Sequence, residues 1–129
     1  MSFCTAVNCM DGRVQLPVIE YLRKRLGVPY VDSVTEAGPV LSLSEKPSGS
    51  VTESIVERVE VSTEAHGSSV VAVVAHWDCT RNPADEETQR GQLLASVDLL
   101  AGRFPKVTVM GLWVDESWRV REVTNRPPA

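Results

Sequence analysis

"VVAVVAHWDC", residues 70–79, begins with a run of small and β-branched apolar residues and ends in a histidine, a tryptophan, an aspartate and a cysteine. A continuous apolar run of this length is typical of a strand buried on both faces, as strands are in parallel sheets. The stretch therefore predicts a buried strand over 70–75, with His76 and Cys79 just beyond its end.

The segments on either side of this strand alternate between strand and helix patterns. Further strands are predicted over 3–9, 30–34, 106–114 and 118–123, and helices over 14–26, about 51–66 and within 84–104. Residues 35–50 are rich in Gly, Pro and Ser and are predicted to form a long loop. This alternation predicts an α/β fold with a mainly parallel sheet of four to five strands and helices on both faces, in one domain over 1–129.

Composition excludes several classes of partner. The formal net charge is −4 and no run of Lys and Arg is present, which argues against nucleic acid. No stretch approaches the roughly 20 apolar residues of a membrane span, and the first residues lack a signal-peptide pattern, so we expect a cytoplasmic protein with no membrane partner. Three cysteines are an odd number in a reducing compartment, which favours metal or thiol chemistry over disulfides.

Two of the predicted strands end in residues that bind metals or carry charge. The first strand ends at Cys9, with Asp11 and Arg13 directly after it, and the strand quoted above is followed by His76 and Cys79. If these strands are neighbours, the two thiols and the imidazole meet at the carboxyl edge of the sheet, where ligands gather in α/β folds. That donor set suits tetrahedral Zn²⁺ with one position open. Asp11 could fill the open position, or pair with Arg13 and leave it to water.

The remaining residues of these types are interpreted as structural. Strand alternation points Cys4 away from Cys9, which makes it a small core residue. Asp78 is expected to cap the following turn or to accept a hydrogen bond from a backbone amide. The three tryptophans, Trp77, Trp113 and Trp118, are expected to pack in the molecule or between subunits.

The pattern of these residues resembles that of the β-carbonic anhydrases, in which Cys-x-Asp-x-Arg follows the first strand and His-x-x-Cys follows a later one. Both halves are present in the same order, as "CMDGR" at 9–13 and "HWDC" at 76–79. The stretches "YVDSVTEAGP" and "ESIVERVEVSTEAHGSSVVAVVAHWDC" are similar to the family's second strand and to its helix and ligand-bearing strand. The ending "GLWVDESWRVREV" is similar to those of a short carbonic-anhydrase-like branch, so the resemblance covers most of the chain.

The resemblance implies a lyase that reversibly hydrates CO₂ to bicarbonate. Zn²⁺ would be held by Cys9, His76 and Cys79, and Asp11 and Arg13 would form the catalytic dyad that orients the attacking hydroxide. Asp11 is also the candidate fourth zinc ligand, which would close the site when Arg13 releases it. A homodimer or larger homo-oligomer is expected, because a small sheet with an exposed edge and three tryptophans needs cover.

The sequence departs from the family pattern at three points. Gly12 stands where typical members have Ser, and Thr80 stands where they have Gly. Larger members carry a substrate-contacting Gln and further helices before the first strand, and with Cys9 close to Met1 we expect neither. Two alternatives therefore stay open: a zinc hydrolase of a related linear substrate such as COS or CS₂, and a non-catalytic zinc-binding or thiol-sensing module in which Asp11 closes the fourth position.

Overall fold

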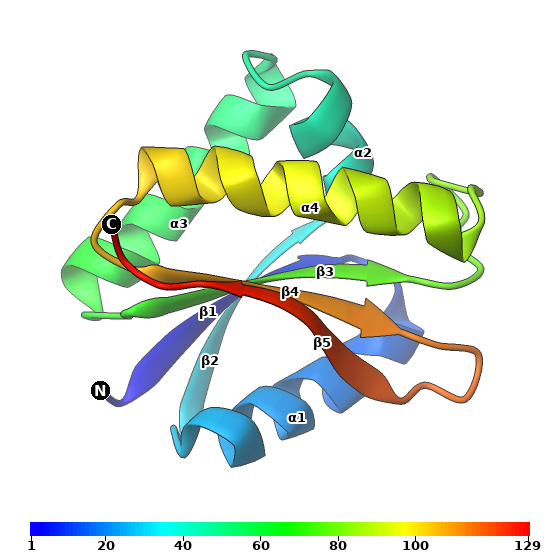
Figure 1. Cartoon of the computed structure of the whole chain (residues 1–129). Coiled ribbons are helices and arrows are strands. Elements are labelled where there is room, and N and C mark those ends of the chain that lie inside the picture. The colour runs from blue at the N-terminus through cyan, green and yellow to red at the C-terminus, as the bar shows by residue number, and fades with distance from the viewer.

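Strands and helices alternate along the chain in the computed structural model, which describes residues 1–129 (Figure 1). The elements are β1 (Phe3–Cys9), a short 3₁₀ helix η1 (Gly12–Val14), α1 (Gln15–Leu26), β2 (Tyr30–Glu36), α2 (Pro39–Glu45), α3 (Ser50–Ala65), β3 (Val70–His76), α4 (Glu86–Arg103), β4 (Thr108–Val114) and β5 (Val120–Arg126). None of the helices is both long and apolar enough to cross a membrane.

The five strands form one sheet in the order β2-β1-β3-β4-β5. The first four are parallel, and β5 runs antiparallel to β4. From β1 the chain moves outward to β2 and then returns to β3 on the other side of β1. The strand order therefore reverses between β1 and β3, the position at which α/β sheets bind ligands.

Helices cover both faces of the sheet, which confirms the predicted fold class. In Figure 1, α1 lies below the sheet, and α2, α3 and α4 lie above it. Along β3, Ala72 and Val74 pack in the core cluster on the α1 face, whereas Val71, Val73 and Ala75 pack in the cluster beneath the other helices. Because strand side chains alternate between faces, a strand covered twice needs apolar residues at every position, as 70–75 has.

The predicted long loop over 35–50 is wrong, because β2 continues to Glu36 and α2 occupies Pro39–Glu45. Proline at the first position of a helix has a favourable φ and lacks only an N–H that would be unpaired there. Val40 and Leu43, three positions apart, are buried. A short amphipathic helix therefore lies in a segment whose Gly, Pro and Ser content is typical of a loop.

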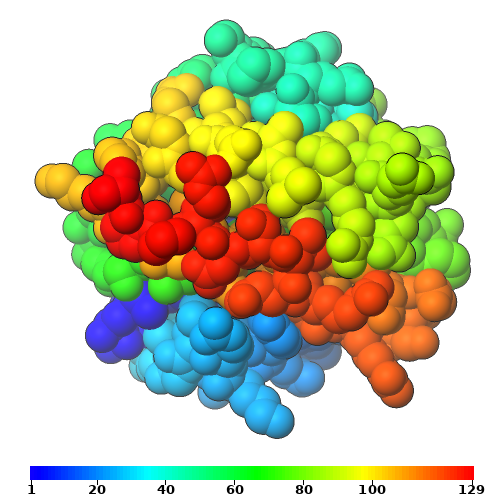
Figure 2. All heavy atoms as spheres, viewed as in Figure 1, coloured from blue at the N-terminus to red at the C-terminus, as the bar shows by residue number.

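The two sheet edges differ in how far they are covered. Figure 2 shows β5, in red, lying between α4 and α1 on the surface of this face, and most of its residues are partly or fully exposed. At the opposite edge β2 is also largely accessible, with only Val34 buried. The last strand is longer than predicted, since it continues from Val123 to Arg126 through its ladder with β4.

Candidate metal centre

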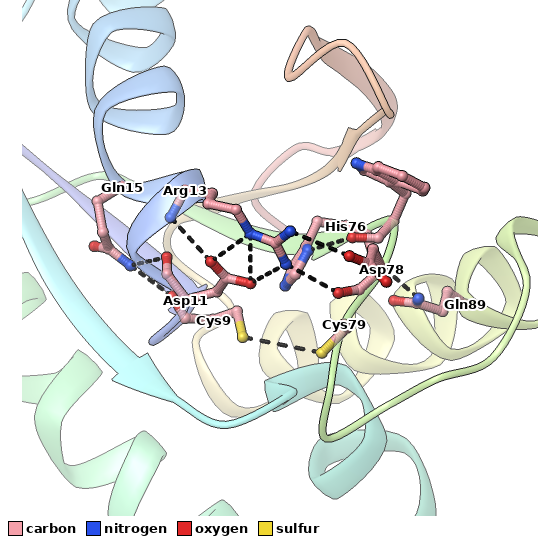
Figure 3. Close-up of polar contacts among 9 residues, drawn as sticks. Cys9, Asp11, Arg13, Gln15, His76, Asp78, Cys79 and Gln89 are labelled. Atoms are coloured by element: carbon pink, nitrogen blue, oxygen red, sulfur yellow. Dashed lines mark hydrogen bonds and ion pairs between the residues drawn. The ribbon is translucent and has the colours of Figure 1, made fainter.

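The sheet brings the three predicted ligands together. β1 and β3 pair in parallel, with Val7 opposite Val73, so both strands end at the same edge. Cys9 is the last residue of β1, His76 is the last residue of β3, and Cys79 follows in the next turn. Their ligand atoms all lie within 4.8 Å of one another and all three residues are buried, an arrangement that could hold a metal ion (Figure 3).

The donor atoms fit a zinc ion in spacing and in chemistry. The Sγ atoms of Cys9 and Cys79 are 4.0 Å apart, and two sulfurs at about 2.3 Å from a tetrahedral zinc lie roughly 3.8 Å apart. His76 Nδ1 donates to the carbonyl oxygen of Trp77 at 2.7 Å, so its Nε2 is left as an acceptor. This Nε2 is buried without a hydrogen-bond partner. A bound cation would satisfy it, and a carbonyl on the other ring nitrogen is the usual support of a metal-binding histidine.

The two thiols titrate as a pair. A hydrogen bond from Cys79 lowers the pKa of Cys9 to about 4, against the opposing effect of burial. The same hydrogen bond, together with burial, raises the pKa of Cys79. For His76, burial lowers the pKa, but the neighbouring Cys9 and the Trp77 carbonyl outweigh it and the net change is upward. The surroundings thus favour a thiolate at Cys9, and a thiolate is the form of cysteine that binds a metal ion.

Asp11 is held beside this cluster by Arg13. Its Oδ1 accepts from the backbone N–H of Arg13 at 2.9 Å and from Nε at 3.1 Å, and its Oδ2 accepts from Nη2 at 2.7 Å. Asp11 is also the N-cap of η1, which sets the two side chains on the same side of the turn. The Arg13 hydrogen bonds lower the pKa of Asp11 to about 2, so the group is a carboxylate at neutral pH.

The expectation for Asp78 is wrong. Its carboxylate caps no backbone amide and instead accepts from Arg13 Nη1 at 3.1 Å, while its carbonyl oxygen accepts from Nη2 at 3.1 Å. Asp78 has a φ of 54°, and this left-handed backbone turns both groups toward the guanidinium. Its partner lies 65 residues earlier in the chain, so no local pattern could reveal the contact.

Two glutamines that sequence reasoning passed over support the ligand-bearing segments. Gln15 donates to the Cys9 carbonyl oxygen at 2.6 Å and to that of Asp11 at 3.2 Å. Gln89, on α4 and only 1% exposed, donates to the His76 carbonyl oxygen at 2.9 Å. A polar residue on the buried face of a helix is the signal that could have singled out Gln89, because a buried amide needs partners.

A cavity of ≈ 600 Å³ adjoins the cluster, within the range of about 300–1,000 Å³ that is common for small-molecule sites. It is lined by Cys9, Met10, Asp11, Gly12, Ala37, Cys79, Thr80 and Arg81. A Cβ at Gly12 would meet nothing within 4 Å, so the missing side chain leaves open space next to Asp11. Two of the three candidate ligands, Cys9 and Cys79, therefore line the same cavity as Asp11.

Comparison with known proteins identifies a matching family and several solved structures of similar fold. Over residues 1–124 the chain matches the family described as "Putative carbonic anhydrase". No curated protein sequence matches it. Its fold is similar to that of a chain from the crystal structures of two tetrameric β-carbonic anhydrases of Sordaria macrospora (TM-score 0.61, 14% identity, 97% of this chain and 82% of that chain). It is also similar to the β-carbonic anhydrase CafA of Aspergillus fumigatus (TM-score 0.59, 14% identity, 95% of this chain and 74% of that chain). A third similar structure is the β-carbonic anhydrase CcaA (TM-score 0.64, 13% identity, 99% of this chain and 78% of that chain).

Proposed function

We propose that this chain, which belongs to the putative carbonic anhydrase family matched over residues 1–124, is a zinc-dependent lyase. The proposed reaction is the interconversion of CO₂ and bicarbonate. The observation that carries the proposal is the buried cluster of Cys9, His76 and Cys79, in which the imidazole Nε2 has no partner. The cluster stands beside a carboxylate held by an arginine and opens to a cavity.

Each residue has a distinct task in the proposed reaction. Cys9, His76 and Cys79 would hold the zinc ion. The chemistry supplied there by zinc is a hydroxide nucleophile at neutral pH, since zinc lowers the pKa of water from about 15.7 to about 7. Asp11 would accept a hydrogen bond from the nucleophile and direct its lone pair toward the substrate carbon. Arg13 donates to both oxygens of Asp11, which keeps the carboxylate in one orientation.

Assembly into a homo-oligomer forms part of the proposal. The Sordaria macrospora proteins of similar fold are described as tetrameric. Tyr30, at the start of the edge strand β2, is 57% exposed, and Leu16 on α1 is 66% exposed. A homodimer or larger assembly would cover such side chains. We also propose a cytoplasmic location, because all three cysteines are free thiols and two of them are needed as zinc ligands.

Metal content and activity can be tested on one preparation. We expect about one zinc per chain by elemental analysis and CO₂ hydration above the buffer rate by stopped flow. Cys79→Ser should lose both, because a hydroxyl is a poor zinc ligand. Cys4→Ala is the matched control: it also removes a buried thiol of the same chain, and it should keep its zinc and its activity.

Two outcomes would redirect the proposal. A zinc-loaded protein that hydrates no CO₂ but releases sulfide from COS or CS₂ would be a hydrolase of these linear substrates. A zinc-loaded protein inert toward all of them, whose metal no added anion can reach, would be the non-catalytic module. The bidentate hold of Arg13 on Asp11 supports the lyase, because a carboxylate paired with Arg13 would leave the fourth position of a bound zinc to water.

A further inference from the structure

Arg13 has more partners than Asp11 alone. Its Nη1 donates to Asp78 Oδ2 and its Nη2 donates to the Asp78 carbonyl oxygen, both at 3.1 Å (Figure 3). With Nε and Nη2 bonded to Asp11, four of the five N–H donors of the guanidinium are used. One face of the group stacks on Trp118, with Cζ 4.8 Å from the ring centroid.

Asp78 and Trp118, which contact the edge and the face of Arg13 that Asp11 leaves free, share an uncommon backbone conformation. Asp78 has a φ of 54° and Trp118 a φ of 59°, and no other non-glycine residue of the chain has a positive φ. Asp tolerates the left-handed region, but for a bulky residue such as Trp it is a genuine outlier. Outliers of this kind persist where the surrounding structure holds them, and they gather at functional sites.

The turn that carries Trp118 is braced by hydrogen bonds. Asp115 Oδ1 accepts from the backbone N–H of Ser117 at 2.9 Å and of Arg119 at 3.0 Å. The Trp118 N–H donates to the Asp115 carbonyl oxygen at 2.9 Å. The β4–β5 loop and the turn after β3 therefore reach the same guanidinium from two separate parts of the chain.

We propose that Asp78 and Trp118 are positioning residues that hold Arg13, and through it Asp11, in the orientation the reaction needs, an inference that rests on the proposed function. Arg13 is a long side chain that is 46% exposed, and the Asp11 pair alone leaves its other edge and both faces free. Asp78 fixes the second edge and Trp118 fixes one face. Without them Arg13 would gain rotamers, and Asp11 would be free to act as a further ligand to a bound metal ion.

The hold on Arg13 can be measured without any metal, from the exchange of its Nε–H proton with water by ¹⁵N NMR. Trp118→Leu and Asp78→Gly should each speed this exchange about fivefold, the change expected from losing one exposed cation–π contact or hydrogen bond. Trp118→Phe, which keeps a ring, and Asp78→Asn, which keeps an acceptor and tolerates the left-handed backbone, should restore slow exchange. Asp98→Asn removes a surface carboxylate paired with Arg126 and should change nothing.

The consequence for Asp11 is read from the cobalt-substituted protein titrated with thiocyanate and followed by visible absorption. Trp118→Leu should weaken thiocyanate binding about fivefold at unchanged metal content, because freed Asp11 competes for the same position. Faster Nε–H exchange with unchanged thiocyanate affinity would overturn the link to Asp11, and unchanged exchange would overturn the positioning role. If the native protein binds no cobalt or zinc, the proposed function fails on that count, whereas the exchange result still decides whether the two residues hold Arg13.

Discussion

Cys4 and Cys9 lie on the same strand, yet they belong to different chemical environments. Cys9 has a thiol and an imidazole beside it at the carboxyl end of β1. Cys4 is fully buried in the core cluster of the α1 face, so it is a core residue as predicted. The expected separation from Cys9 onto opposite faces is wrong, because Cys9, the last residue of β1, belongs to the same cluster. Burial, followed by the nearby charge of Asp32, raises the pKa of Cys4 to about 11. One residue type therefore serves as packing at one end of a strand and as a candidate ligand at the other.

This difference predicts that Cys4 resists alkylation. A thiolate is the reactive form, and with a raised pKa it becomes abundant only as pH rises toward 11. At pH 8 we expect iodoacetamide to modify Cys4 far more slowly in the folded protein than in guanidinium, with a rate that increases with pH. Peptide mass spectrometry of time-quenched samples gives the rates. Equal labelling of Cys4 in folded and unfolded protein would contradict the buried, unreactive assignment.

The residues of the site were predictable only where the signal was local. Cys9, His76 and Cys79 follow predicted strands, and the carboxyl ends of neighbouring parallel strands share one edge. Asp78 and Trp118 give no such signal, because what places them is a left-handed backbone and a partner far away in the chain. Sequence periodicity indicates which residues face inward, but it does not indicate which guanidinium a turn residue will meet.

At the scale of elements, the strongest apolar patterns predicted the strands and long helices well. The run over 70–75 became β3, extended by His76, and the helical spacing between Val14 and Leu26 became α1. The failure at α2 has a physical reason: its helix is only seven residues long, and it gains stability by packing against α4 rather than from its own propensity. Short elements of this kind depend on tertiary contacts that composition does not reveal.

A pair of glycine substitutions tests how closely α4 packs on the sheet. A Cβ at Gly111 in β4 would lie 3.0 Å from Thr124 Cγ2 and 3.2 Å from atoms of both Leu93 and Val97. Gly111→Ala should therefore destabilise the protein by about 1–3 kcal/mol through overpacking. At Gly91, on α4, an added Cβ would meet nothing within 4 Å, so Gly91→Ala should stabilise the protein by about 0.5–1 kcal/mol.

Urea unfolding followed by circular dichroism measures both changes in the free energy of unfolding. The two variants add the same methyl group, so an effect of alanine in general would move them in the same direction. A neutral or stabilising Gly111→Ala would show that α4 can shift away from β4 without cost.

For the whole molecule, the core and the candidate metal centre occupy different places. Two apolar clusters pack on opposite faces of the sheet, and the ligands stand at its carboxyl edge. Cys9 and Cys79 join the smaller cluster only at its margin, next to the cavity. The hydrophobic contacts that stabilise the fold are therefore mostly independent of a bound ion.

This separation predicts that chelation destabilises the protein without unfolding it. Removal of zinc should lower the melting temperature and leave the far-ultraviolet circular dichroism spectrum unchanged at 25 °C. Zinc at about a thousand times its Kd should return roughly 4 kcal/mol of stability. Loss of secondary structure on chelation would instead identify the ion as an obligatory part of the fold, as a structural zinc module requires.

The two sulfurs that meet at 4.0 Å are 70 positions apart in the chain. During synthesis Cys9 leaves the ribosome first, and at about 5–20 residues per second its partner follows roughly 4–14 seconds later. Throughout that delay the Cys9 thiol of the nascent chain is exposed, because neither β3 nor the sulfur of Cys79 is yet beside it. A cation bound by this pair could therefore be captured only late in synthesis, and oxidants would have several seconds to reach Cys9 before the site forms.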